Sequence, residues 1–582
     1  QTAAVEHFEG VFCHQCRETV DRECRELWLR AMASRTGAPQ PITKDELLAA
    51  ATAWQPGKTT GPDGISYECL RGVLERPGWA EWLGEIFTEV LRNGEVPASW
   101  TGSLTVLLPK CAAPTLWRET RPITLSSVLL KVFAQVLQRR LGDTLREPTR
   151  IQFAARGKQV ADMTLAVQKL VRVAEEWKLP LLLAKLDVRQ AFDRVAQPKI
   201  GEMVASRCQE SSPWEVAAWL SMIHAREIVI SVGSEDLKIR QSNGVRQGSP
   251  DSPTLFALIN EEVALGAMQH RERDRGLTTT GSHNVPPGPI PAALLLFMDD
   301  AWVIAMLWED LQERVNGLTR ELRTIGLALG PGKTQVLASP AAPPGVLRME
   351  GQAVAPVPLG DTVHALGTPV GFRTALNSPM REACGKARAS FWAQSRLFLR
   401  ELPMPCRLKL MEKTVQASAL WNAGCFPVQR QGLQMLNACQ LKLVRRMRGT
   451  KRPADIPWLE WELRQLRIGR AQLHAAGVAR WSTVALQRIW ELWGHVARQR
   501  GPAREILQWR DLQWWKREQS LMGGQRHPGR FSPHVDPERR IQSVIDRRVQ
   551  PPQPWMDVAQ DRAHWQSLRE FFVAENDVPW TG

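Results

Sequence analysis

The spacing of apolar and polar residues predicts a first part of mixed helices and strands and a last part of helices alone. Apolar residues recur every three or four positions over 126–145 and 311–325, which is the period of an amphipathic helix. Short apolar runs bounded by turn residues predict strands, and these lie at 104–108, 181–186, 227–233, 294–297 and 302–305. After residue 378 the period is helical, with a polar, proline-rich break at 523–554.

Three carboxylates stand where predicted strands end. Asp187 directly follows the run 181–186, and Asp299 and Asp300 occupy the predicted hairpin tip between 294–297 and 302–305. Adjacent carboxylates repel each other and cost stability unless a cation neutralises them. Hard carboxylate oxygens suit Mg²⁺, and such a cluster can hold two ions for phosphoryl transfer. A solvent-exposed Asp-Asp turn without function is the alternative.

Composition and charge narrow the class of protein. The 582 residues include 75 Lys and Arg against 60 Asp and Glu, a net charge of +15 that favours a polyanionic partner over a merely basic surface. From residue 441 onward there are 25 basic and 15 acidic side chains, so ten of the fifteen net charges lie there. The composition excludes a disordered or collagen-like chain, and no apolar run is long enough to span a membrane.

The first residue and the cysteines indicate whether the chain is part of a longer protein and in which compartment it occurs. The chain starts at Gln1 rather than Met and shows no signal peptide, so we expect a piece of a longer polyprotein. Cys13, Cys16 and Cys24 could begin a zinc site, but no second ligand pair follows at the usual spacing. Reduced thiols in an intracellular protein are the favoured interpretation.

Taken in order, eight segments resemble the motifs of the reverse transcriptases of non-LTR (LINE-type) retrotransposons. The segments are Lys58–Ile65, Lys110 with Arg121–Ile123, Gln152–Phe153 with Asp162, Asp187–Asp193 (motif A), Gly244–Pro250 (motif B), Phe297–Asp300 (motif C), Leu329–Thr334 (motif D) and Ala365–Gly367 (motif E). The resemblance runs from about residue 45 to 375. Asp251 and Met298 depart from the family's usual residues, and neither change removes a functional group.

The resemblance implies an α+β fold, a right-hand polymerase with fingers, a palm with a four-stranded antiparallel sheet, and a thumb. We expect a linker or the end of an upstream module at 1–40, fingers at 41–180, the palm at 181–375, a helical thumb at 376–450 and a basic, Trp- and Arg-rich helical region at 451–582. The function implied is that of an RNA-directed DNA polymerase that extends a DNA 3′-hydroxyl on an RNA template by two-metal phosphoryl transfer.

The resemblance also assigns roles to single residues. Asp187, Asp299 and Asp300 would bind two Mg²⁺ ions, for which Mn²⁺ can substitute, and Lys333 would act beside the leaving pyrophosphate as a general acid. The residues expected to bind the dNTP are Lys110, Arg121, Phe192, Gln247 and Gly248. Among these, Lys110 and Arg121 would clamp the triphosphate and Phe192 would exclude a 2′-hydroxyl. The implied partners are an RNA template, a DNA primer or target and dNTPs, with no membrane, in a ribonucleoprotein of nucleus and cytoplasm.

Two other functions remain open on the sequence. A catalytically inactive RNA-binding relic would keep the fold, but relics usually lose an acid of the triad, and Asp187, Asp299 and Asp300 are all present. An RNA-templated RNA polymerase also carries paired aspartates, and Phe192 and the motif B residues speak against it. The tryptophans after residue 451 suit either stacking on RNA or packing in a helical core, and core packing is favoured for most of them. We expect a deletion of 451–582 to weaken RNA binding while the polymerase chemistry survives.

Overall fold

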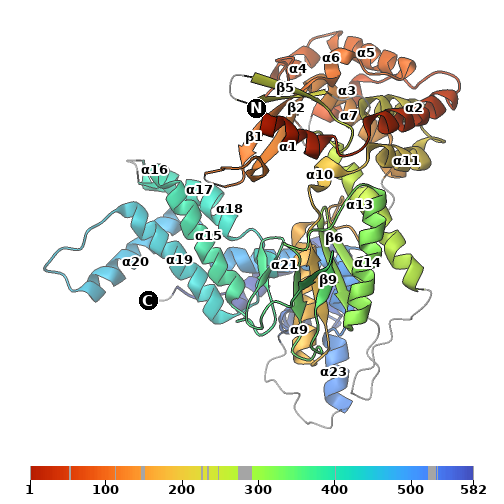
Figure 1. Ribbon diagram of the computed structural model, residues 1–582. Coiled ribbons are helices and arrows are strands. Elements are labelled where there is room, and N and C mark those ends of the chain that lie inside the picture. Colours follow the sequence, from red (N-terminus) through yellow and green to blue (C-terminus); the bar gives the residue numbers. More distant parts are fainter. Residues whose placement is uncertain are drawn as a thin grey trace.

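The structure is a computed structural model that describes residues 2–51, 54–111, 113–145, 151–223, 227–232, 235–246, 248–272, 292–399, 402–521, 533 and 535–580. Figure 1 shows an N-terminal lobe at the top, a sheet with flanking helices below it, and an arm of helices to one side. After residue 378 the described residues form helices and no strand, as the sequence predicts.

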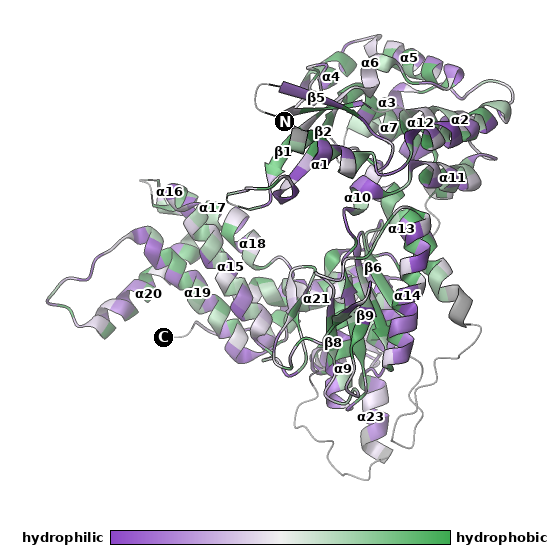
Figure 2. Cartoon of the chain, in the orientation of Figure 1, coloured by the Kyte–Doolittle hydropathy of each residue, from purple (hydrophilic) through white to green (hydrophobic). Residues whose placement is uncertain are grey.

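The lower sheet has four strands in the order β6-β7-β3-β8, and every neighbouring pair is antiparallel. Its strands are β3 (Leu182–Leu186), β6 (Leu294–Phe297), β7 (Asp300–Ala305) and β8 (Gln335–Ala338). These strands are largely apolar (Figure 2), because both faces are covered by other elements. This confirms the antiparallel palm sheet within an α+β fold. Two small hairpins follow, β9 (Leu347–Met349) with β10 (Gln352–Val354) and β11 (Val363–Ala365) with β12 (Thr368–Val370).

The upper sheet combines strands from two distant parts of the chain. Its order is β2-β1-β4-β5, with β1 antiparallel to β2 and parallel to β4. Its strands are β1 (Ser103–Pro109), β2 (Thr120–Ser126), β4 (Glu227–Val232) and β5 (Glu235–Arg240). The β4–β5 hairpin lies within the stretch 181–375 that we assigned to the palm, yet it extends the sheet of the N-terminal lobe. That stretch therefore contributes to both sheets.

Helices pack around the upper sheet and connect it to the palm. The predicted helix at 126–145 begins two residues later, because Ser126 is the last residue of β2, and it is divided at Leu141. The helix that begins at Lys44 starts with a capping box, in which the Thr43 amide donates to Glu46 Oε2 (2.8 Å). The helices of this part are α1 (Thr2–Phe12), α2 (Arg17–Ala33), α3 (Lys44–Ala51), α4 (Tyr67–Leu74), α5 (Trp79–Asn93), α6 (Ala98–Thr101), α7 (Val128–Arg140), α8 (Gly142–Leu145), α11 (Gln197–Cys208) and α12 (Pro213–Ile223), with a 3₁₀ turn at Trp117–Glu119.

Three further helices carry or flank the palm motifs. They are α10 (Ala191–Arg194), α13 (Ser252–Glu272) and α14 (Trp308–Thr324). The α14 helix is followed by Gly326, whose φ of 79° is readily adopted only by glycine. The predicted insertion loop at 276–291 lies outside the described residues.

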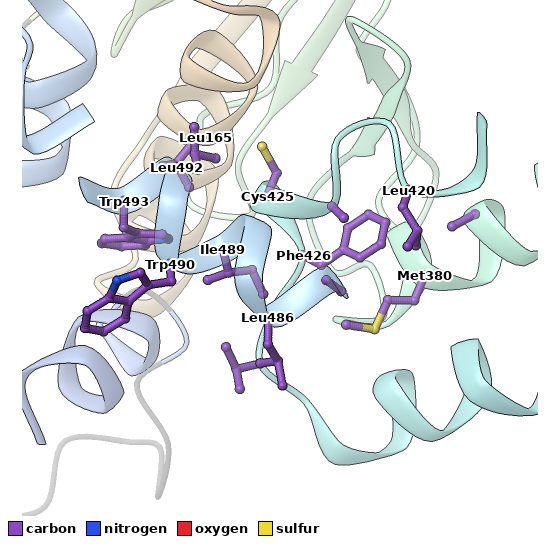
Figure 3. Close-up of a cluster of buried hydrophobic side chains, with 14 of the residues drawn as sticks. Leu165, Met380, Leu420, Cys425, Phe426, Leu486, Ile489, Trp490, Leu492 and Trp493 are labelled. Carbon is purple, nitrogen blue, oxygen red and sulfur yellow. The ribbon is translucent and has the colours of Figure 1, made fainter. Parts of the chain in front are cut away.

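One hydrophobic core joins the palm, the thumb and the C-terminal helices. Its central element is α9 (Val160–Glu176), which packs against the palm strands and against helices from the end of the chain. Figure 3 shows Leu165 of this helix beside Leu492, with Cys425 nearby and Phe426 farther along the cluster beside Leu420 and Met380. The helices after the palm are α15 (Ser378–Ala393), α16 (Ser395–Phe398), α17 (Met404–Met411), α18 (Ala417–Ala419), α19 (Arg430–Arg448), α20 (Trp458–Ala475), α21 (Trp481–Arg498), α22 (Pro502–Gln508), α23 (Leu512–Leu521), α24 (Asp536–Arg548), α25 (Trp555–Val558) and α26 (Arg562–Asn576), with a π-helical turn at Glu412–Gln416 and a 3₁₀ turn at Ala423–Cys425.

Most of the C-terminal tryptophans belong to this core. Trp490 and Trp565 are fully buried and stacked, with ring centroids 4.1 Å apart, and each indole N–H donates to the other residue's carbonyl. Gly494 permits this stack, since a Cβ there would lie 2.2 Å from the Trp565 indole nitrogen. The core role favoured for these rings is therefore the observed one, whereas Trp458 is 60% exposed.

The expected break at 523–554 needs a correction. Residues Asp536–Arg548 form the regular helix α24, whose Pro537, Ile541, Val544 and Ile545 are buried. Apart from the buried Glu538, its charged residues are exposed or half-buried, and they made the segment read as polar in sequence. Across the described residues, none of the helices combines the length and the apolar character that crossing a bilayer requires.

Candidate active site

The three predicted acids meet at one end of the palm sheet. Strand β3 places Asp187 one residue beyond Leu186, which pairs with Ala301 of β7. Asp300 is the first residue of β7, and Asp299 occupies the two-residue turn before it. Because β3 and β7 are neighbours in the sheet, the strand end and the hairpin tip present their carboxylates on the same edge.

Two buried amide side chains hold the hairpin turn in place. Met298 has a φ of 55°, in the left-handed region that a non-glycine residue rarely adopts. Asn260 of α13 donates from Nδ2 to the Met298 carbonyl (2.7 Å), and Gln152 Oε1 accepts the Met298 N–H (3.0 Å). The Gln152 backbone N–H in turn donates to the Glu261 carboxylate (3.1 Å). This network fixes the turn that presents Asp299.

Burial and the neighbouring carboxylates raise the pKa values of the two hairpin acids. Partial burial raises the pKa of the Asp299 carboxyl, and the charges of Asp300 and Asp187 raise that pKa further. Burial also raises the pKa of Asp300, and the Lys185 ammonium, 3.4 Å from Asp300 Oδ1, opposes that increase. The same ammonium donates to the His364 carbonyl (3.0 Å). Negative charge is thus concentrated here beyond what one lysine neutralises.

The segment predicted as motif D passes directly against motif A. The Gly330 N–H donates to the Asp187 carbonyl (2.7 Å), and a Cβ at Gly330 would lie 3.1 Å from Asp187 Oδ2. A larger residue would therefore crowd the carboxylate. Lys333 Nζ lies 3.8 Å from Asp187 Oδ1, and its side chain is 78% exposed. The structure thus brings Lys333 together with the acids and leaves its amine open to solvent.

The predicted sugar-selecting and motif B residues lie next to one another. Phe192 of α10 stacks on Phe256 of α13, with ring centroids 4.6 Å apart, and its carbonyl accepts the Val245 N–H (2.8 Å). Gly248 has a φ of 106°, and a Cβ there would lie 2.9 Å from the Thr124 carbonyl oxygen of β2. Glycine is therefore required where this loop approaches the N-terminal lobe. Gln247 lies outside the described residues.

Lys110 and Arg121 occupy the β1–β2 hairpin. Both are exposed, and Arg121 pairs in register with Leu108. Lys110 Nζ donates to the Arg118 carbonyl (3.0 Å). In the described part of the chain neither residue forms an ion pair with Asp187 or the hairpin acids. The geometry places them on a separate lobe from the carboxylates.

The donor set fits a hard divalent cation in its chemistry. Carboxylate oxygens at strand ends are the ligands that Mg²⁺ prefers, and a cation would relieve the repulsion that raises the pKa values of Asp299 and Asp300. With the side chains as they stand, no three acidic, His or Cys groups in the described ranges gather closely enough to ligate one ion. Lys185 and Lys333 instead lie against Asp300 and Asp187. The same holds for the zinc site that Cys13, Cys16 and Cys24 suggested in sequence, and the Cys13 thiol instead donates to the Arg240 carbonyl.

Sequence reasoning missed the residues that support the acids. Lys185 interrupts an otherwise apolar strand, which is the one signal that could have marked it. Gln152 was noted only as part of a motif, and Asn260 lies inside a helical pattern without any distinguishing feature. Asp251, a departure from the family pattern, is buried and accepts hydrogen bonds from the Ser249 hydroxyl and the Trp219 indole N–H. It therefore stabilises the motif B loop.

Comparison with known proteins agrees with this geometry. The reverse transcriptase (RNA-dependent DNA polymerase) family matches residues 110–370. The Pol polyprotein of the type-1 retrotransposable element R2 of Nasonia vitripennis is 25% identical over 324 residues, 55% of this chain and 28% of that protein. The 149 kDa protein of transposon TX1 of Xenopus laevis is 29% identical over 246 residues, 41% of this chain and 18% of that protein.

A third relative comes from Drosophila melanogaster. The probable RNA-directed DNA polymerase from transposon BS is 24% identical over 344 residues, 56% of this chain and 35% of that protein. The chain thus spans about a fifth to a third of the length of these relatives. A solved apo telomerase from Candida tropicalis aligns with a TM-score of 0.32 at 15% identity, over 48% of this chain and 59% of that one, a similarity too low to identify a fold.

The matched range begins at Lys110 and ends at Val370, so it contains the whole palm sheet and the three acids. The relatives are polyproteins and polymerases of retrotransposable elements, in agreement with the motif order. Residues 110–370 of the chain are therefore a reverse transcriptase domain of the kind that non-LTR retrotransposons encode.

Proposed function

We propose that the protein is an active RNA-directed DNA polymerase that extends a DNA 3′-hydroxyl on an RNA template. The observation that carries this proposal is the convergence of Asp187, Asp299 and Asp300 at one edge of the palm sheet of a reverse transcriptase domain. An inactive RNA-binding relic is not favoured, because all three acids are retained together with the contacts that hold their turn.

The three carboxylates would hold two divalent cations, Mg²⁺ or Mn²⁺. When bound, such ions would lower the pKa of the primer 3′-hydroxyl and neutralise charge on the phosphates. The chain positions the ligands through the sheet register and the Gln152–Asn260 clamp on the turn. Lys185 limits the repulsion between the carboxylates before substrate arrives. Lys333, solvent-exposed beside Asp187, would donate a proton from Nζ to the departing pyrophosphate.

The remaining proposed roles concern the dNTP. Lys110 and Arg121 would bind the triphosphate once the β1–β2 hairpin lies over the palm, since both side chains are exposed. Phe192, fixed by its stack on Phe256, would block a 2′-hydroxyl. Gly248 and Gln247 would let the motif B loop approach the template and incoming base. The proposed partners are an RNA template, a DNA primer or target and dNTPs, assembled as a ribonucleoprotein in the nucleus and cytoplasm.

A primer-extension assay on a poly(A) template with Mg²⁺ and dNTPs tests the proposal. Asp299→Asn should lower the extension rate by at least about a hundredfold, because an amide cannot replace a charged metal ligand. RNA binding should persist in that variant. Asp455→Asn, at an exposed turn before α20, is the matched control and should extend normally. Substantial extension by the Asp299 variant would show that the hairpin is not the site.

A further inference from the structure

A groove lined by aromatic and basic side chains leads away from the hairpin tip. Next to the turn, a hollow of about 490 Å³ is lined by Phe297, Met298, Lys158 and Trp421. A second hollow, of about 990 Å³, is lined by Trp421 together with Arg488, Arg498 and Arg562. The two hollows share Gln159, Ala161 and Trp421 in their linings, so they adjoin at these residues, and we name the pair the Trp421 groove.

Trp421 stands at the junction of the two hollows with its indole open to solvent. It is 65% exposed, the most exposed of the large hydrophobic residues in the described chain, and lies between α18 and the 3₁₀ turn at Ala423–Cys425. A large apolar ring in solvent lacks the favourable free energy of burial that the buried C-terminal tryptophans gain. An exposed indole beside cations is the arrangement on which nucleic-acid bases stack.

The basic residues of the second hollow retain free positive charge. Arg498 donates to the Ala559 carbonyl (2.8 Å), which uses one of its five N–H groups, and its pKa is lowered by burial and by the nearby Arg562 charge. Neither the Arg498 nor the Arg562 guanidinium forms an ion pair with a carboxylate in the described residues. Glu491, the acid on the same wall, is held by Arg569 (2.8 Å). Two neighbouring guanidinium groups that no carboxylate pairs with can bind a phosphate.

We propose that the strand carrying the reacting 3′-hydroxyl leaves the catalytic edge through the Trp421 groove, with a base on Trp421 and its phosphates against Arg498 and Arg562. The inference rests on the proposed function, because the primer 3′ end must lie at the carboxylates that Asp299 belongs to. The groove begins at the residue before Asp299, so the nucleotides preceding that end reach Trp421 first and the two arginines next.

The test measures binding of a primer–template by fluorescence anisotropy at several salt concentrations, without divalent cations or dNTPs. Replacing both Arg498 and Arg562 by Gln should lower the slope of log affinity against log salt by about 1.4–1.8, because each lost phosphate contact removes about 0.7–0.9. Trp421→Ala should weaken binding about tenfold through the lost stack. Both variants should melt like the wild type, since Trp421 and Arg562 are exposed and a glutamine at the half-buried position 498 keeps an N–H donor for the Ala559 carbonyl.

The matched control removes two exposed guanidinium groups elsewhere. Arg22→Gln with Arg25→Gln on α2 changes the net charge equally and should leave the slope unchanged. Neutral methylphosphonate linkages placed in the primer strand should weaken binding to the wild type, and add nothing to the Arg498–Arg562 double variant. The proposal would be overturned if the control variant lost as much slope as the Arg498–Arg562 variant. It would also be overturned if the effects of the substitutions and of the primer methylphosphonates simply added, or if methylphosphonates in the template strand alone gave the non-additive result.

Primer extension on the same samples separates this inference from the proposed function. A wild type that shows the expected non-additivity yet never extends a primer would refute the polymerase proposal and leave the groove in place. A double variant that extends saturating primer normally and binds it like the wild type would refute the groove and leave the polymerase in place.

Discussion

A buried ion pair fastens the C-terminal helices to the helix behind the palm. Lys169 of α9 and Glu538 of α24 have 3% and 0% of their side chains exposed, and Nζ lies 2.9 Å from Oε1. The other oxygen of Glu538 accepts the N–H of Leu512, the first residue of α23 (3.0 Å). One carboxylate therefore joins three helices, and its loss should release the C-terminal region from the palm.

Lys169→Met removes the cation and keeps the apolar part of the side chain. Breaking a buried pair by removing one partner costs about 3–5 kcal/mol, because the remaining charge is left buried. The double variant Lys169→Met with Glu538→Gln removes both charges and keeps an acceptor for the Leu512 N–H. It should recover most of the loss, ending about 1–2 kcal/mol below the wild type.

The loss should depend on pH in a defined direction. Burial raises the pKa of Glu538, and the Lys169 ammonium opposes that increase, so removing Lys169 should raise the pKa further. A raised folded-state pKa gives stability that is present below the unfolded value, about 4.3, and is lost as pH rises through the folded value. The deficit of Lys169→Met should therefore be small near pH 4 and grow toward neutral pH.

Thermal melting across this pH range, together with limited proteolysis, measures the effect. A chain of this size need not unfold in two states, so the midpoint is the readout, and it should fall by about 3–10 °C at pH 7. Lys199→Met is the control, because Lys199 pairs with Glu202 at a similar distance (2.8 Å) with both side chains about half exposed. A deficit that is the same at every pH, or that the double variant does not relieve, would refute the electrostatic account.

Three further outcomes are expected. Phe192→Val should raise the use of rNTPs relative to dNTPs in primer extension, and an unchanged ratio in an active variant would reduce Phe192 to its stack on Phe256. Asp299→Asn should raise the melting midpoint at pH 7 in EDTA and converge with the wild type near pH 4, because burial and neighbouring carboxylates raise the pKa of Asp299 and its ionised form destabilises the metal-free fold. Deleting residues 451–582 should give an insoluble or strongly destabilised protein, since it exposes the shared core, and this replaces the surviving polymerase chemistry expected from the sequence; a soluble truncation with an unchanged melting midpoint would contradict it.

Local patterns predicted the strands and the acids that follow them. The run before Asp187 and the apolar segments around Asp299 and Asp300 each lie within a few residues, and their periods match the observed strands. The pairing of β4 with β1 could not be predicted in this way. Ser103 and Ile228 are far apart in sequence, and the pattern of a strand does not indicate which other strand it pairs with. Helix α24 was missed for a related reason, since its buried face is only evident once α9 is beside it.

The support of the hairpin was hidden for a physical reason as well. A polar residue within an apolar pattern indicates a buried hydrogen bond, but it does not say to which group. Gln152 and Asn260 reach the Met298 backbone from two different elements, and that convergence exists only in the folded chain. Sequence reasoning therefore located the three carboxylates proposed for catalysis and left out the side chains that position them.

The positive charge of the last quarter shows why net charge alone misjudged this region. Many of its arginines are neutralised by carboxylates, as in Arg480 with Asp577 and Arg547 with Glu575. Ion pairs of this kind hold helices together and do not offer charge to a polyanion. Among the basic residues of this region without a carboxylate partner are Arg498 and Arg562, to which the proposal above assigns the contact with nucleic acid. Deleting the region would remove the core and the groove together, whereas substituting Arg498 and Arg562 alters the groove while the core stays intact.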